Sequence, residues 1–204
     1  MKIGIIQASS QIEKNTILYE CTKDYGEVIN FGCFEDEENY SYVEIALEIC
    51  LLISSQAVDF IVTGCSSGQG MMIACNSLPN LICGYLPTPQ DAYLFGRIND
   101  GNVASLPLSL NYGWAGEINL KATLQQLFEE PFGIGYPLKD AKRKKEDTKK
   151  IKELNQLAKK DVITFLDELD QQMINKILSK KNVIDYILKY GKDKRIKQWI
   201  LNRR

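Results

Sequence analysis

One short segment of the chain combines a nucleophilic side chain with a glycine-rich turn. VTGCSSGQGMMIACN, residues 62–76, places Cys65 directly after a β-branched run, and Gly68 and Gly70 follow it. A helix that begins near Gly70 would aim its positive end and several backbone N–H groups at one point. Such donors stabilise an anion, or an oxygen that becomes negative during a reaction. The segment therefore predicts an anion-stabilising loop that contains a thiol.

The residue types of this loop exclude two common kinds of site and leave two interpretations of Cys65. GCSSG fits the pattern of a hydrolase nucleophile elbow, but the chain has no histidine, so the usual triad cannot form. A phosphate-binding P-loop needs Lys and then Ser or Thr after its last glycine, where this chain has Met71 and Met72. Either Cys65 is reactive, because thiols at helix N-termini ionise readily, or it is a small residue in a tight turn.

Short strands and helices alternate along residues 1–137 and must position this loop. We expect strands at residues 2–7, 27–32, 58–64, 81–86 and 102–108, and helices at 11–25, 42–54, 70–78, 88–97 and 115–130. Apolar strands that alternate with helices are typical of a parallel sheet covered on both faces. The pattern predicts an α/β, Rossmann-like three-layer fold with a five-stranded parallel sheet. Ligands of such sheets bind beyond the carboxyl ends of the strands, where Cys65 lies.

The character of the chain changes after residue 137. Residues 1–138 carry a net charge of −11 and residues 139–204 a net charge of +10. We therefore predict a core, residues 1–137, followed by a helical C-terminal extension, residues 138–204. Nucleic-acid binding by the Lys/Arg run at 142–150 is disfavoured, because no aromatic residues are interleaved with the charges. We expect the extension to serve assembly.

The extension contains an amphipathic pattern that calls for a packing surface. A single helix is predicted over residues 161–178. Its apolar face is formed by Val162, Phe165, Leu166, Leu169, Met173, Ile174 and Ile177. This face packs either on the core of its own chain or on a partner, and the sequence does not choose between the two.

The cysteines and the hydropathy of the chain bear on its surroundings. None of the six cysteines forms a CxxC pair, which argues against a zinc site and against a secreted disulfide framework. No apolar run approaches the ~18 residues of a membrane span, and MKIGIIQ is too short to be the apolar region of a signal peptide. We expect a cytoplasmic location, with no metal, no cofactor and no membrane partner.

Several segments together carry a resemblance to a known family. MKIGIIQ, EVINFG, GCSSGQGMMIACNSLPN, LICGYL and INDGNVASLP follow one another with the spacing of that family. Residues 1–137 resemble the ribose-5-phosphate isomerase B and galactose-6-phosphate isomerase (RpiB/LacA/LacB) family. The resemblance implies an aldose–ketose isomerase that acts through an enediolate and shares its active site between the two subunits of a homodimer. The extension resembles that of a longer subgroup of the family.

The resemblance also assigns roles to particular residues. Cys65 falls on the family's base, which moves a proton between C1 and C2 of an open-chain sugar, and Ser67 falls on a threonine beside the anion hole. The N–H groups around Ser67, Gly68 and Gly70 would hold the enediolate oxygen. The further substrate-binding residues that it predicts are Ser9, Ser66, Asn99 and Lys139.

The chain departs from the family pattern at positions that concern the substrate. Ala8 and Ser9 stand where the family has Asp-His, and Ile98 stands where it has the histidine that opens the sugar ring. Near the family's phosphate-binding arginines this chain offers Lys139, Lys142 or Arg143. Proton transfer is therefore expected to be retained, while ring opening and phosphate recognition are altered.

Three functions remain open at this point. The resemblance favours isomerisation of a sugar phosphate of the ribose 5-phosphate or galactose 6-phosphate type. The alternative is isomerisation of a non-phosphorylated keto-uronate, because the longer subgroup resembles isomerases that act on keto-uronates. Such a substrate needs no ring-opening histidine. The third is a catalytically inactive sugar-binding protein.

Tyr40 and Tyr42 either reach the site around Cys65 or pack on the core.

Overall fold

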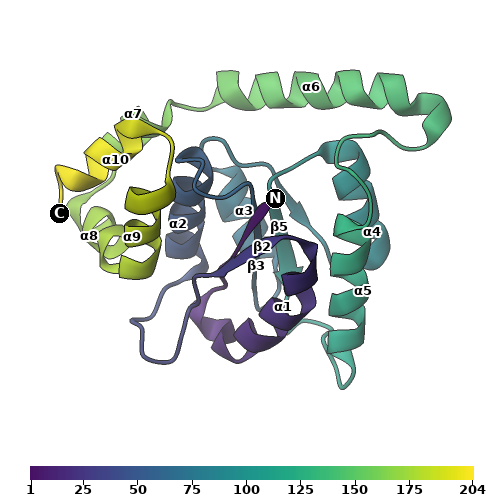
Figure 1. Cartoon of the computed structure of the whole chain (residues 1–204), viewed down its shortest axis with the longest axis horizontal. Coiled ribbons are helices and arrows are strands. Elements are labelled where there is room, and N and C mark those ends of the chain that lie inside the picture. Colours follow the sequence, from purple (N-terminus) through teal and green to yellow (C-terminus); the bar gives the residue numbers. More distant parts are fainter.

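Five short strands pair in parallel in a sheet at the centre of the computed structural model, which describes residues 1–204 (Figure 1). The strands are β1 (Lys2–Ile5), β2 (Glu27–Asn30), β3 (Phe60–Cys65), β4 (Cys83–Tyr85) and β5 (Val103–Pro107). Their order across the sheet is β2-β1-β3-β5-β4. The central strand β3 is buried along its whole length, and its last residue, Cys65, is in register with Pro107 of β5.

Helices cover both faces of the sheet, which confirms the predicted fold class. The helices α1 (Asn15–Thr22), α4 (Pro89–Leu94) and α5 (Gly116–Phe128) lie on one face, and α2 (Tyr42–Ser54) and α3 (Gln69–Asn76) lie on the other (Figure 1). Shorter helical turns occupy Ser9–Lys14, Lys23–Tyr25, Phe95–Asn99 and Leu138–Asp140. Each face has its own apolar core, because the alternate side chains of a strand point to opposite faces.

The order of the strands creates a crevice between β1 and β3. From β1 the chain turns to α1 on one face of the sheet, whereas from β3 it turns to α3 on the opposite face. The loop after β1 and the loop after β3 therefore turn away from each other at the carboxyl edge of the sheet. Such a topological switch point is where open α/β sheets bind ligands.

A third loop reaches the same edge from β2. We call residues 31–41, between β2 and α2, the β2–α2 loop. It ends in a capping box, in which the Ser41 hydroxyl accepts the Glu44 N–H at 3.4 Å and the Glu44 carboxylate accepts the Ser41 N–H at 2.6 Å. This arrangement satisfies orphan donors of α2 and fixes the angle at which the loop enters the helix.

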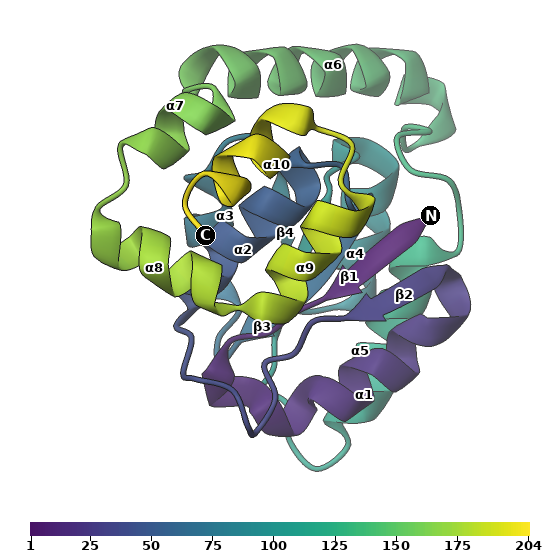
Figure 2. The same cartoon turned by 60° about the vertical axis from the view of Figure 1, so that its left-hand side comes forward.

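The extension contains five helices that follow the core. They are α6 (Ala141–Ala158), α7 (Val162–Asp167), α8 (Gln171–Ser179), α9 (Lys181–Tyr190) and α10 (Lys194–Leu201). The long α6 runs from the α4 side of the molecule to the side where α7–α10 gather near α2 (Figures 1 and 2). The single helix predicted over 161–178 is wrong, because Asp170 accepts the Met173 N–H at 2.8 Å and begins a new helix, α8.

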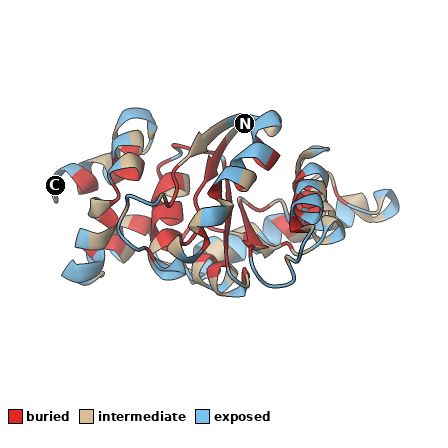
Figure 3. Ribbon diagram, turned by 90° about the horizontal axis from the view of Figure 1, so that it is seen from below, coloured by how far each residue is buried: buried red, intermediate tan, exposed pale blue.

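The apolar side chains of the extension pack on the core of their own chain. Val162, Leu166, Ile174 and Ile177 are buried in the same cluster as the inner side chains of α2. Figure 3 shows buried residues on the strands and on the helix faces that turn inward, including those of the extension. The division into residues 1–137 and 138–204 stays a prediction, and the shared core shows that the two parts are packed tightly together.

The cysteines and the helices agree with a chain that has neither disulfide bonds nor a membrane-spanning helix. All six cysteines are free thiols, and each is buried. No helix combines the length and the apolar character that a membrane span requires.

Candidate active site

The loop after β3 holds the Cys65 thiol at the start of α3. The Gly68 N–H donates to the Cys65 sulfur at 3.2 Å, and only 7% of Cys65 is exposed. Gly68 has a φ of +75°, and a Cβ at this position would lie 2.8 Å from the backbone carbon of Leu106. Glycine is therefore required both for the left-handed turn and for the close approach to β5. The predicted loop geometry is present.

Two backbone donors next to the thiol are free. The N–H groups of Ser66 and Ser67 have no acceptor within the protein. The Ser67 hydroxyl accepts the Gln69 N–H at 3.3 Å, and the Ser66 hydroxyl accepts the side-chain amide of Gln11 at 3.0 Å. These donors, with the first turn of α3, form the kind of preformed anion site that the sequence predicts.

Ser9 and the β2–α2 loop form the opposite wall. The Ser9 hydroxyl accepts the Tyr40 N–H at 2.8 Å, and the Ser9 N–H donates to the Tyr40 carbonyl at 3.0 Å. Tyr40 is 3% exposed and packs in the core, yet it also lines the cavity beside Cys65. Both interpretations of Tyr40 are therefore correct. Ser9 acts here by holding the loop.

A cavity of about 700 Å³ lies between these walls, in the crevice between β1 and β3. Its lining is neutral, with hydroxyl, amide and backbone groups but no carboxylate, ammonium or guanidinium. It is formed by Ala8, Ser9, Ser10, Asn39, Tyr40, Ser41, Tyr42, Cys65, Ser66, Ser67 and Gly70. The volume lies in the usual range of sites for small organic ligands.

Cys65 is the one cysteine that lines this cavity. Burial raises the pKa of the Cys50 thiol to about 12, and it also raises the pKa of Cys21, Cys33 and Cys83 above the ordinary value. A thiol with a raised pKa stays protonated at neutral pH and does not act as a base. Cys65 is therefore the thiol that a ligand in this cavity could contact.

Asn99 and Lys139 do not join this cavity within one chain. Asn99 precedes β5, whereas Cys65 is in register with Pro107 at the end of that strand. The four residue steps from Val103 to Pro107 put about 13 Å between the two ends of β5. Asn99 and Cys65 therefore lie at opposite edges of the sheet. Lys139 is exposed in the turn Leu138–Asp140. Shortly before this turn, the Gly135 N–H donates to the Arg97 carbonyl at 2.8 Å. Both residues belong to the amino edge of the sheet.

The cavity also uses residues that the sequence reasoning missed. Asn39, Ser10 and Ser41 line it, and Gln11 supports Ser66 from behind. Their positions after β1 and β2 were the available signal, because loops at the carboxyl edge are where binding residues gather.

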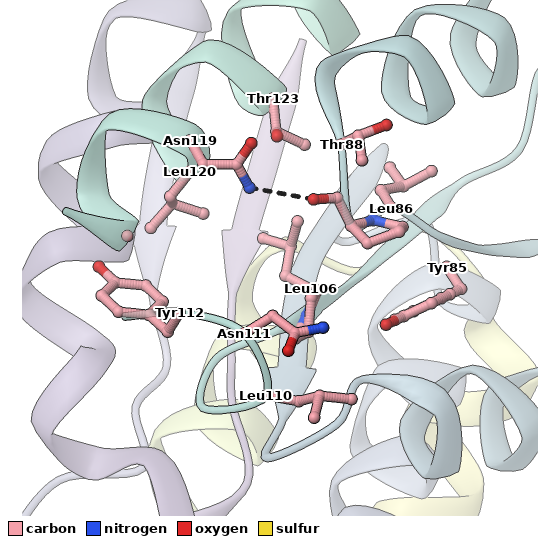
Figure 4. A pocket seen from close by; sticks show the side chains of 13 residues that line it. Tyr85, Leu86, Thr88, Leu106, Leu110, Asn111, Tyr112, Asn119, Leu120 and Thr123 are labelled. Atoms are coloured by element: carbon pink, nitrogen blue, oxygen red, sulfur yellow. Dashed lines mark hydrogen bonds between the residues drawn. The ribbon is translucent and has the colours of Figure 1, made fainter. Parts of the chain in front are cut away.

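A second, smaller cavity of about 280 Å³ lies at the same edge between β4, β5 and α5 (Figure 4). Its wall includes Asn119, whose side-chain amide donates to the Pro87 carbonyl at 3.0 Å, and the buried Thr123 (Figure 4). It shares no lining residue with the Cys65 cavity. None of the predicted site residues lines it.

Comparison with protein families decides the identity of the fold. The family model described as Ribose/Galactose Isomerase matches residues 3–136. The chain belongs to this family. The resemblance drawn from the sequence is thereby confirmed, and the protein is an enzyme of the aldose–ketose isomerase class. None of the curated proteins that were compared matches the chain.

Two solved structures resemble the isomerase over its whole length. One is a 4-deoxy-L-threo-5-hexosulose-uronate ketol-isomerase in complex with tartrate, with 35% identity and a TM-score of 0.94. The other is a ribose-5-phosphate isomerase of Vibrio parahaemolyticus, with 29% identity and a TM-score of 0.94. Each alignment covers 100% of this chain and 99% of the other chain. The extension is therefore common to all three proteins.

Shorter structures share only the fold. The ribose-5-phosphate isomerase B of Clostridium thermocellum is 23% identical, has a TM-score of 0.63 and covers 78% of this isomerase while being covered completely itself. The difference in coverage separates long isomerases, which carry the extension, from short ones.

Proposed function

We propose that the isomerase converts a non-phosphorylated, open-chain keto-uronate, with Cys65 as the base that moves the proton. The observation that carries this proposal is the neutral lining of the Cys65 cavity. A phosphate dianion is usually held by guanidinium or ammonium groups, and this lining offers neither. A single carboxylate can be held by hydroxyl and backbone N–H donors. The long uronate ketol-isomerase, which is 35% identical, supports the same substrate class.

The reaction follows from the donors around Cys65. The Cys65 thiolate takes the proton from the substrate carbon next to the carbonyl, and electrons shift to the carbonyl oxygen to form an enediolate. The N–H groups of Ser66 and Ser67 hold the negative oxygen. The proton then returns to the neighbouring carbon, while the hydroxyl proton moves between the two oxygens with the Ser67 hydroxyl beside them. The substrate is already in the open-chain form, so no ring-opening histidine is needed at the position of Ile98.

We further propose that a second copy of the chain completes the site. Asn99 and Lys139 lie at the far edge of the sheet and can serve Cys65 only from another subunit. An apolar groove between α2 and α3 borders the cavity and shares Tyr42 and Gly70 with it. Ile73 in this groove is 61% exposed, which favours a covered surface in the assembled protein. The assembly is expected to be a homodimer.

Isomerisation of a sugar phosphate is the second candidate. The long ribose-5-phosphate isomerase of Vibrio parahaemolyticus favours it. In that case Lys139 of the second subunit would have to bring the charge that the cavity lacks. The two candidates differ in whether activity requires a phosphate group.

A substrate panel in D₂O tests the proposal. A 4-deoxy-5-keto-hexuronate, ribose 5-phosphate, galactose 6-phosphate and ribose are followed by NMR for isomerisation and for deuterium at C2. We expect exchange with the uronate and a kcat/KM at least 100-fold lower with the phosphates. Turnover confined to the phosphates would overturn the substrate class. Saturable binding of the uronate without exchange would identify an inactive sugar-binding protein.

A further inference from the structure

A lysine with no exposed side-chain surface occupies the corner between α8 and α9. The Lys180 ammonium donates to both carboxylate oxygens of Glu37, at 2.8 and 2.7 Å, and its side chain is 0% exposed. Lysine is almost never buried completely unless it is paired. Glu37 belongs to the β2–α2 loop, so this ion pair joins the extension to a wall of the Cys65 cavity.

Other contacts from the same corner reach the same loop. The Ser179 and Tyr40 hydroxyls share a hydrogen bond of 3.0 Å, and the Lys176 ammonium donates to Glu38 at 2.7 Å. The ring of Tyr40 lies 5.0 Å from the Lys180 nitrogen. Asn182 donates its side-chain amide to the Phe31 carbonyl at 2.9 Å. The extension therefore holds the β2–α2 loop along most of its length.

The other side of this loop faces the substrate cavity. Asn39, Tyr40 and Ser41 line that cavity, and Tyr40 is bonded to Ser9 through its backbone. Residues 31–41 form neither strand nor helix. Backbone hydrogen bonds tie residues 31–33 to the end of β1 and the chain after it and tie Tyr40 to Ser9, but residues 34–39 have no backbone bond to another element. Contacts with neighbouring elements must supply the order that a binding wall needs.

Stability alone does not explain why a lysine is buried here beside a carboxylate that is 20% exposed. Replacing a buried ion pair with apolar residues of similar size is often neutral or stabilising, whereas a pair can enforce one conformation. Glu48 lies behind this pair with both carboxylate oxygens buried and unpartnered, and burial raises its pKa well above the usual range while the Lys180 charge opposes this rise. The corner concentrates polar groups that a purely structural interface would avoid.

We infer that Lys180 is a positioning residue for the isomerase: through Glu37 it fixes the β2–α2 loop so that Asn39, Tyr40 and Ser41 form the substrate-binding wall. The extension is thus part of the catalytic unit. This accounts for the match of the two long isomerases to the whole chain, extension included. The inference rests on the proposed function only in taking the Cys65 cavity as the active site.

The test compares two charge-neutral double variants. Glu37→Gln with Lys180→Met removes the buried pair without leaving a lone charge. Glu168→Gln with Lys160→Met removes an exposed pair within the extension, far along the chain from the loop, and serves as the matched control. A structural role predicts that a variant with normal unfolding also has normal activity. A positioning role predicts loss of activity in a variant that remains folded.

Two readouts separate the outcomes. In the first variant we expect hydrogen exchange at the Tyr40 amide to accelerate at least ten-fold and KM to rise about ten-fold, more than kcat falls. The control is expected to change neither, and Lys180→Arg is expected to retain part of the protection. Unchanged Tyr40 exchange together with unchanged KM would overturn the inference. Hydrogen exchange needs no substrate, so the result stands even where the proposed substrate is wrong. If the variant with Glu37→Gln and Lys180→Met unfolds, the same two measurements are made on Lys180→Arg.

Discussion

The β2–α2 loop presents uncharged groups on one side and charged groups on the other. Towards Cys65 the loop presents an amide, hydroxyl groups and backbone to a cavity without charged residues. Towards the extension it presents Glu37 and Glu38, which are paired with Lys180 and Lys176. On the proposed mechanism, neutral, preformed donors serve the chemistry, while charges hold the loop. An enediolate oxygen needs donors that are already in place, and a mobile charge would have to reorganise.

The sharpest test of the neutral side is removal of the thiol. Cys65→Ala is expected to lower kcat about 10³-fold and to abolish deuterium exchange at C2, because loss of a general base usually costs 10²–10⁴-fold. Thermal unfolding should be nearly unchanged. Cys75→Ala, which removes a buried thiol that does not line the cavity, is the control. Exchange at the wild-type rate in Cys65→Ala would remove Cys65 from the mechanism.

The next effect in size comes from the turn that carries the donors. Gly68→Ala is expected to lower kcat about 100-fold, because its Cβ would meet the backbone of Leu106 and displace the loop. The left-handed backbone adds about 1–2 kcal/mol of destabilisation. Gly113 has a φ of +63° and open space around it, so Gly113→Ala has the backbone penalty without the clash.

Activity assays and urea unfolding on both glycine variants separate the two causes. The Gly113 variant should lose stability but keep kcat within two-fold. If both variants lose activity equally, the close approach to β5 has no role in catalysis.

The sequence was a good guide to one wall of the site and a poor guide to the other. Cys65 and Gly68 stand in one segment whose strand, turn and helix are local, so residue types predict their geometry. Asn39 and Tyr40 depend on contacts with Ser9 and with the extension, more than 130 residues further along the chain in the case of Ser179. Such contacts leave no local pattern.

Other errors have similar causes. The apolar spacing continues through Asp170, so periodicity alone joined α7 and α8, although the capping carboxylate separates them. The assignment of Asn99 to the site stays a prediction, because a motif does not state which edge of the sheet, or which subunit, its residues serve. The strands were predicted well, because apolar runs between helices leave few alternatives to a parallel sheet.

Lys139 of a second subunit would bring a positive charge to the uncharged side of the β2–α2 loop. Lys139→Ala is expected to raise KM about ten-fold and to change kcat less, because charge on the remote acidic end of a substrate is felt equally in the ground and transition states. Lys150→Ala, on the exposed surface of α6, is the control and should leave KM unchanged.

Mixing two inactive variants tests the same point directly. Cys65→Ala and Asn99→Ala chains, refolded together, are expected to recover activity because one hybrid site has both residues intact. Separate chains should stay inactive. The absence of recovery in a sample that contains mixed dimers would place each site within a single subunit.

A buried carboxyl group of α2, behind the charged side of the loop, is expected to affect stability rather than activity. Burial raises the pKa of Glu48 well above its ordinary value of 4.5, so the folded protein keeps a proton that the unfolded chain releases. The unfolded state then binds fewer protons as the pH rises above about 4.5, and stability falls by up to about 1.4 kcal/mol per pH unit until the folded pKa is reached. Glu48→Gln removes this slope. We expect urea midpoints of the variant and the wild type to agree near pH 4 and to diverge as the pH rises above about 4.5, with the variant more stable. Glu146→Gln, exposed on α6, should show no such divergence. Parallel curves for Glu48→Gln and the wild type would show that Glu48 is ionised in the fold and that Lys180 neutralises two carboxylates rather than one.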